Sequence, residues 1–158
     1  MKNTSLCYIE KDGKYLMLFR NEKANDPNEG KWLGIGGKFE KGESPEECVS
    51  REVFEETGLI LKQKSFRGIV TFDNDKYETE YMFVFTSNDF NGNIVKKCNE
   101  GTLKWINKQD ILSLPLWEGD KYFLELLAKD APFFSLKLTY SGDKLLKAFL
   151  NGEELSKN

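Results

Sequence analysis

Runs of apolar residues that alternate with polar ones predict short strands along most of this chain of 158 residues. The expected strands cover 5–10, 14–20, 64–73, 77–87, 102–106, 134–140 and 144–150. Three pairs of these strands flank short turns at Lys11-Asp12-Gly13, at Asn74-Asp75 and at Ser141-Gly142-Asp143. The pattern therefore predicts three hairpins.

A helix with well-defined ends is predicted between the first and second hairpins. Ser44 is a favourable N-cap, Pro45 suits the first helical position, and Glu47 completes a capping box. Gly58 is placed to end the helix. These signals predict a helix over 45–57.

The remaining segments complete an α/β pattern. Two further helices are expected near 108–113 and 118–129, whereas 21–31 is polar and is expected to form a loop. Four glycines within 32–42 indicate tight backbone geometry or close approach of a ligand. Strands interspersed with helices predict a single domain over 1–158, in which a mixed sheet packs against helices.

Charge and composition exclude several functional classes. The net charge is −3 and the sequence pI is about 5.2, so the chain lacks the basic character of a nucleic-acid-binding protein. It contains no histidine, which excludes His-based catalytic triads, imidazole bases and the usual zinc sites. A divalent metal can still hold a polyanionic ligand against an acidic protein.

The expected location is the cytoplasm. Cys7, Cys48 and Cys98 follow no metal-binding spacing and are expected to be reduced thiols. No apolar run reaches the length of a membrane span, and the N-terminus lacks the apolar core of a signal peptide. We expect neither a membrane partner nor a stable nucleic-acid complex.

Three glutamates share one side of the first predicted helix. At about 100° per residue, Glu52, Glu55 and Glu56 fall along one stripe, where like charges repel one another. Cys48 and Val49 lie one turn earlier on the same side, so the acids are expected to face inward. Such carboxylates need a counter-charge, and a hard divalent cation such as Mg²⁺ is the natural partner.

The stretch around these acids resembles the Nudix box. From Gly37 to Leu59 the sequence reads GKFEKGESPEECVSREVFEETGL, which fits the pattern G-x5-E-x7-R-E-U-x-E-E-x-G-U, where U is a bulky aliphatic residue. The resemblance implies the Nudix fold, with a mixed β-sheet sandwiched between helices (α/β/α). It also implies a hydrolase of nucleotide diphosphate linkages that uses Mg²⁺, with Mn²⁺ as a substitute.

The resemblance also implies roles for individual residues. The expected metal ligands are Glu52, Glu55, Glu56, Gly37 and Glu100, the last of these on the loop before the strand at 102–106. Arg51 would orient the glutamates through a salt bridge, and Glu43 would support the site. Because the chain has no histidine, a glutamate must act as general base. Glu52, Glu56 and Glu100 are all candidates for that role.

Two further segments are similar to the MutT-like branch of the family, which hydrolyses oxidised purine nucleoside triphosphates. These segments are 31–38 (KWLGIGGK) and 114–120 (LPLWEGD). By this resemblance Trp117 would stack on the base, and Asp120, together with Glu118, would accept hydrogen bonds from it. The other implied substrate contacts are Leu33, Gly36, Lys38 and three aromatic pocket walls, Phe72, Tyr81 and Phe83.

The sequence departs from that branch at two positions. Its animal members carry asparagine where this chain has Leu33, and a pair of aspartates where it has Glu118-Gly119-Asp120. A leucine side chain cannot hydrogen-bond a base. Recognition of an oxidised purine would therefore depend on other groups, or the substrate is a different nucleotide.

Three functions follow from these observations. The leading one is a nucleoside triphosphate pyrophosphatase that removes oxidised purine nucleotides such as 8-oxo-dGTP. The second keeps the chemistry but acts on the 5′ triphosphate end of RNA or on a nucleoside diphosphate derivative. The third is a non-catalytic nucleotide-binding module, which the intact set of box glutamates disfavours. The sequence does not predict the oligomeric state, the number of metals, the phosphorus attacked or the role of 130–158.

Overall fold

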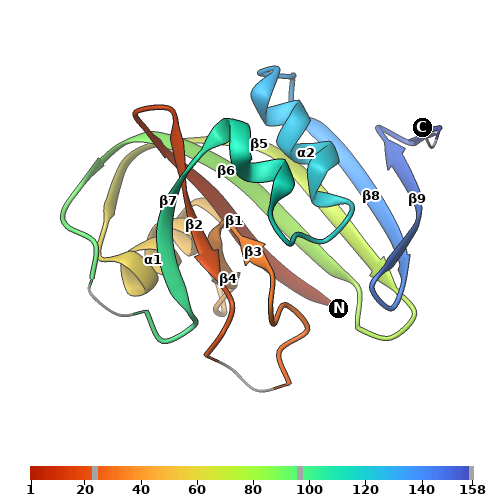
Figure 1. Ribbon diagram of the computed structural model, residues 1–158, viewed down its shortest axis with the longest axis horizontal. Coiled ribbons are helices and arrows are strands. Elements are labelled where there is room, and N and C mark those ends of the chain that lie inside the picture. The colour runs from red at the N-terminus through yellow and green to blue at the C-terminus, as the bar shows by residue number, and fades with distance from the viewer. Residues whose placement is uncertain (23–24, 96–97, 157–158) are drawn as a thin grey trace.

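A computed structural model describes residues 1–22, 25–95 and 98–156. In these residues the strands form one mixed sheet in the order β10-β9-β8-β5-β6-β1-β2-β3, with β4 paired to β1 and β7 paired to β2 (Figure 1). The strands are β1 (Lys2–Lys11), β2 (Lys14–Phe19), β3 (Trp32–Leu33), β4 (Ile35–Lys38), β5 (Ile60–Asn74), β6 (Glu80–Asn91), β7 (Thr102–Asn107), β8 (Phe134–Ser141), β9 (Lys144–Leu150) and β10 (Glu153–Glu154). The helices are α1 (Pro45–Thr57), the 3₁₀-helix η1 (Lys108–Ser113) and α2 (Asp120–Ala128).

The three predicted hairpins are confirmed. β1 pairs with β2, β5 with β6, and β8 with β9, each time antiparallel. In the first turn Asp12 and Gly13 have φ angles of 53° and 73°. Two successive left-handed residues match the right-handed twist of the strands that they join.

Two parallel pairings bring distant parts of the chain together. β1 lies beside β6, with Lys2 opposite Glu80, and β8 lies beside β5, with Tyr140 opposite Asn74. The start of β1, the β5–β6 turn and the tip of the β8–β9 hairpin therefore lie at the same end of the sheet, at the bottom in Figure 1.

α1 forms where its capping signals predict it. The Glu47 N–H donates to the Ser44 hydroxyl at 3.1 Å, and the Ser44 N–H donates to the Glu47 carboxylate at 2.9 Å. At the other end Gly58 adopts a φ of 82°, and its N–H bonds to the carbonyl of Phe54. Both ends of the helix that carries the box acids are thus fixed by local hydrogen bonds.

Different helices cover the two faces of the sheet, so the predicted α/β/α arrangement is confirmed. α1 buries Val49 and Val53 in one core cluster, and η1 and α2 bury Ile111 and Phe123 in the other. The short segment near 108–113 is 3₁₀-helical, as suits a connector of six residues. Within the described ranges, no helix has both the length and the apolar character needed to cross a bilayer.

Candidate active site

A cavity of about 560 Å³ joins the box acids to the second tryptophan segment. Glu52, Glu56 and Glu100 line it on one side, and Trp117 and Asp120 line it on the other. Its size lies in the range of small-molecule and cofactor sites. The other predicted site residues that line it are Leu33, Gly36, Gly37, Lys38 and Phe72.

The three acids of α1 differ in how deeply their side chains are buried. Glu56 is buried and Glu52 is half-buried, but 54% of the Glu55 side chain is exposed. With about 100° per residue, Glu56 falls between Val49 and Glu52 on the buried face, whereas Glu55 falls on its outer edge. The expectation that all three acids face inward is therefore corrected for Glu55, which also lies outside the cavity lining.

Glycine backbone packs directly against the acids. A side chain at Gly37 would collide with the carboxylate of Glu52. The N–H of Gly36 donates to the Glu56 carboxylate at 3.2 Å. The glycines of β4 therefore let its backbone approach the acids closely, as the glycine-rich sequence predicts.

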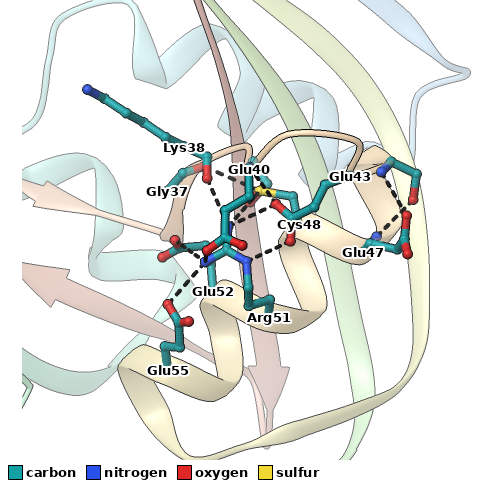
Figure 2. Close-up of polar contacts among 11 residues, drawn as sticks. Gly37, Lys38, Glu40, Glu43, Glu47, Cys48, Arg51, Glu52 and Glu55 are labelled. Carbon is teal, nitrogen blue, oxygen red and sulfur yellow. Dashed lines mark hydrogen bonds and ion pairs between the residues drawn. The ribbon is translucent and has the colours of Figure 1, made fainter.

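Arg51 holds the acidic loop and helix together (Figure 2). Its Nε donates to Glu43 at 2.6 Å, and its Nη1 donates to Glu52 at 2.8 Å and to Glu55 at 3.1 Å. Its Nη2 donates to the carbonyl of Lys38 at 2.9 Å. The bond from Arg51, with a further one from the backbone N–H of Glu40, lowers the pKa of Glu43 to about 2. The salt-bridging position that the sequence predicts for Arg51 is the one observed, and Arg51 does not line the cavity.

Arg51→Lys is expected to lower kcat/KM by about 10- to 100-fold, a usual cost for the loss of a group that orients metal ligands. One ammonium cannot replace the three guanidinium nitrogens that hold separate partners. Steady-state kinetics on the preferred nucleotide measure this. Arg67→Lys is the matched control, because Arg67 is also a largely buried arginine that pairs with an acid, Asp130 at 3.0 Å, but lies outside the cavity lining. Equal activity of the two variants would contradict the orienting role.

The acids at the cavity repel one another electrostatically. Burial is the main cause that raises the pKa of Glu56 to about 8, and the charges of Glu52 and Glu100 add to it. Burial likewise raises the pKa of Glu52. Arg20 offsets part of this charge, since its Nη2 lies 3.3 Å from Glu100 and its Nε lies 2.8 Å from Asp26.

This donor set fits a hard divalent cation. Buried carboxylates with raised pKa values are stabilised in their charged form by a nearby cation, and their oxygens are the ligands that such ions prefer. Across 1–22, 25–95 and 98–156, no three acids or cysteines already stand in the arrangement of metal ligands. Arg51 bonds Glu52 and Glu55, and Arg20 pairs with Glu100, so the two arginines neutralise part of the charge of these acids.

The other side of the cavity is aromatic and contains a buried acid. The indole N–H of Trp117 donates to the Asn28 side chain at 2.8 Å, and its ring meets Phe72 edge-on at 5.2 Å. The ammonium of Lys31 lies 4.4 Å from the centre of the same ring. Burial raises the pKa of Asp120 to about 8, with a further contribution from Glu80. Burial therefore favours the neutral form of Asp120, in which the carboxyl can donate as well as accept a hydrogen bond.

Two of the aromatic pocket walls expected from the sequence are misplaced. Tyr81 and Phe83 do not line the cavity, whereas Glu80 and Met82 do. Successive strand residues face opposite sides of the sheet, so Tyr81 and Phe83 cannot face the cavity when Glu80 and Met82 do. Phe83 packs on the α1 side, with its ring 5.1 Å from that of Phe39.

Other residues of the site carry no local signal in the sequence. Arg20, Asp26 and Asn28 come from the polar segment after β2, and Glu80 comes from the start of β6. Glu118, expected to assist Asp120, is exposed and lies outside the cavity lining.

Comparisons with known proteins agree with this geometry. The family model described as "NUDIX domain" matches residues 2–127. The chain is similar to "Uncharacterized Nudix hydrolase YvcI" of Bacillus subtilis (strain 168), with 32% identity over 89% of this chain and 88% of that protein. It is 33% identical to an ADP-ribose pyrophosphatase of Methanocaldococcus jannaschii, over 90% of this chain and 69% of that protein.

A third relative and one solved structure extend the comparison. An oxidized purine nucleoside triphosphate hydrolase of Mus musculus is 29% identical over 66% of this chain and 67% of that protein. The crystal structure of a MutT protein from Bacillus halodurans superposes with a TM-score of 0.85 at 29% identity, and the match covers 97% of this chain and 99% of that one.

Proposed function

The chain belongs to the Nudix family and is a pyrophosphohydrolase of the MutT type, and on this premise we propose that it hydrolyses nucleoside triphosphates to monophosphate and pyrophosphate with Mg²⁺. We propose that oxidised purine nucleotides such as 8-oxo-dGTP are its preferred substrates. The observation that carries this proposal is the single cavity that joins Glu52, Glu56 and Glu100 to Trp117 and Asp120.

The proposed metal site uses oxygen ligands of this chain. Glu52, Glu56 and Glu100 would hold the ion, with the backbone of Gly37 as a further ligand. When bound, Mg²⁺ (or Mn²⁺ in its place) would polarise the phosphoryl group and lower the pKa of a bound water. Glu56, which is buried and lines the cavity, is one candidate for the general base. Glu52 and Glu100 stay candidates for the same role.

The rest of the cavity would bind the nucleotide. Lys38, beside the Gly36-Gly37 backbone, would face the phosphates, and Trp117, Phe72 and Leu33 would enclose the base. Asp120 would hydrogen-bond the base edge from a site with little water, where such a bond discriminates strongly between bases. A water molecule then attacks a phosphorus atom of the triphosphate, and the bond from that phosphorus to its bridging oxygen breaks.

A nucleoside diphosphate derivative is the second candidate substrate. The observation in its favour is the relative from M. jannaschii named as an ADP-ribose pyrophosphatase, which matches 90% of this chain. The chemistry at the acids would be the same, and the second ribose would need to lie where a triphosphate has only its terminal phosphates.

A substrate panel tests the proposal. The purified protein is incubated with Mg²⁺ and 8-oxo-dGTP, 2-oxo-dATP, the ordinary dNTPs and NTPs, or ADP-ribose, and kcat/KM and the products are determined for each. We expect a preference of about tenfold or more for an oxidised purine over its ordinary counterpart, the size that one or two hydrogen bonds at a base edge provide. A flat profile, or a preference for ADP-ribose, would refute the proposed specificity.

A further inference from the structure

The C-terminal hairpin, formed by β8 and β9, is fixed at the cavity end of the sheet. Its tip is held by the β5–β6 turn, where Asn74 Nδ2 donates to the carbonyl of Gly142 at 2.7 Å. Asp75 accepts from the hydroxyl of Ser141 at 2.7 Å and from the N–H of Gly142 at 2.9 Å. The family match ends at residue 127, so this hairpin lies beyond it.

One residue of the hairpin reaches the segment that carries Trp117 and Asp120. Tyr140 is buried, and its hydroxyl oxygen accepts the N–H of Gly119 at 2.7 Å. Its ring lies 5.2 Å from that of Trp117, edge-on, and 5.1 Å from that of Phe72. Because Phe72 and Trp117 also meet at 5.2 Å, the three rings form a closed aromatic cluster, two members of which line the cavity.

The absence of a side chain at Gly119 allows its backbone to approach Tyr140 closely. A Cβ at this position would lie 2.6 Å from Cδ1 of Leu138 and 2.7 Å from the hydroxyl of Tyr140, closer than real Cβ atoms come to other atoms. The backbone between Trp117 and Asp120 therefore packs closely against β8, and a side chain at Gly119 would displace the ends of Leu138 and Tyr140.

The hairpin also places an acid near the charge above the indole. Asp143, at its tip, lies 3.9 Å from the ammonium of Lys31, which sits over the Trp117 ring. Lys31 in turn favours the ionised form of Asp120 and so opposes the rise in its pKa. The hairpin thus contacts the side of the cavity that contains Trp117 and Asp120 through a hydrogen bond, an aromatic cluster and an ion pair.

We propose that Tyr140 is a specificity-determining positioning residue, which sets the placement of Trp117 and Asp120 through its hydrogen bond to Gly119 and its ring contacts. This inference rests on the proposed function, because it assumes that the base binds beside Trp117 and Asp120. Tyr140 does not line the cavity and acts through those two residues. The functional unit then includes residues beyond 127, as expected for one domain over 1–158.

Tyr140→Phe tests the proposal, because it removes the hydroxyl and keeps the ring. We expect KM for the preferred nucleotide to rise about two- to tenfold, with kcat changed by less than about twofold, since the lost hydrogen bond affects base binding and not the acids. Discrimination between that nucleotide and its ordinary counterpart should fall. Tyr122→Phe is the matched control, as Tyr122 is a half-buried tyrosine of α2 outside the cavity lining.

A second readout separates this inference from the proposed function. Titration of the metal-free protein with the nucleoside monophosphate of the best substrate in the panel measures base binding without hydrolysis. Tyr140→Phe should raise this Kd by the same factor as KM, whichever nucleotide is best. A lower Tm with unchanged KM, Kd and discrimination would reduce Tyr140 to a structural role and overturn the inference. Failure of the wild type to hydrolyse any triphosphate would instead refute the proposed function.

Discussion

Glu56→Gln is expected to lower kcat by about 10²- to 10⁴-fold while the protein stays folded. Glu56 is the most buried of the box acids, and it lies beside Glu52 and Glu100 at the cavity. As a metal ligand it would lose the charge that holds the cation, and as a general base it would lose the site that accepts the proton. Either role predicts a loss in kcat, because a glutamine amide can provide neither function.

The same substitution is expected to leave stability unchanged or raised in the metal-free protein at alkaline pH. A buried carboxylate near two others destabilises the folded state when it is ionised, and glutamine removes that charge with almost no change of volume. Kinetics combined with thermal unfolding at pH 8.5 measure both effects. Glu46→Gln, on the exposed first turn of α1, is the matched control and should preserve activity. Glu56→Gln with more than a tenth of wild-type kcat would contradict a direct role in the reaction.

Both ends of the helix that carries these acids could be predicted to the residue, because the signals that define them lie within a few residues of each end. Ser44, Glu47 and Gly58 fix both ends by hydrogen bonds that span only a few residues. Proline suits the first helical position, and the observed helix begins at Pro45 and ends at Thr57. The hairpins were predicted for the same reason, since turn residues act on their immediate neighbours. The Nudix box lies within one such local unit, so its acids could be identified before the fold was known.

The faces of the long strands were less predictable. β5 and β6 contain register shifts between Leu61 and Gln63, between Gln63 and Ser65, and between Phe66 and Gly68. A slip of one residue exchanges the two faces of a strand. Tyr81 and Phe83 lie outside the shifted region, but the sequence pattern does not show which face of β6 borders the cavity, and Glu80 and Met82 face it instead.

Contacts between distant strands had no signal in the sequence at all. Arg20 pairs with Glu100 across 80 positions, and Tyr140 on β8 meets Gly119 at the start of α2. Such pairings depend on the order of strands in the sheet, which a local pattern does not encode. The chemistry of the acids was thus accessible from the sequence, whereas the arrangement of the base side required the fold.

Removal of divalent metal is expected to abolish hydrolysis and to make stability decrease as pH rises. The pKa of Glu56 is about 8 in the folded chain, against an ordinary value of 4.5. A group with a raised folded pKa contributes stability that is complete below its unfolded pKa and is lost as pH rises through its folded pKa. The metal-free protein should therefore lose stability between about pH 4.5 and pH 8, and the raised pKa of Asp120 adds to this loss.

Mg²⁺ should reverse the part of this trend that comes from the acids. Metal binding requires ionised carboxylates, so Mg²⁺ should stabilise the protein more at pH 9 than at pH 6. At a concentration of about 100 times its Kd, a ligand stabilises the folded state by about 2.7 kcal/mol. Thermal unfolding at both pH values, with EDTA or with excess Mg²⁺, measures the difference for wild type and for Glu56→Gln.

The variant distinguishes the two buried acids. In Glu56→Gln the stabilisation by Mg²⁺ should be small at both pH values, while the loss of stability due to Asp120 persists because that residue lies on the other side of the cavity. In Asp120→Asn the stabilisation by Mg²⁺ should remain, and the metal-free protein should depend less on pH. A Tm that does not respond to Mg²⁺ in the wild type, or that responds more at pH 6 than at pH 9, would contradict a metal site built on Glu56.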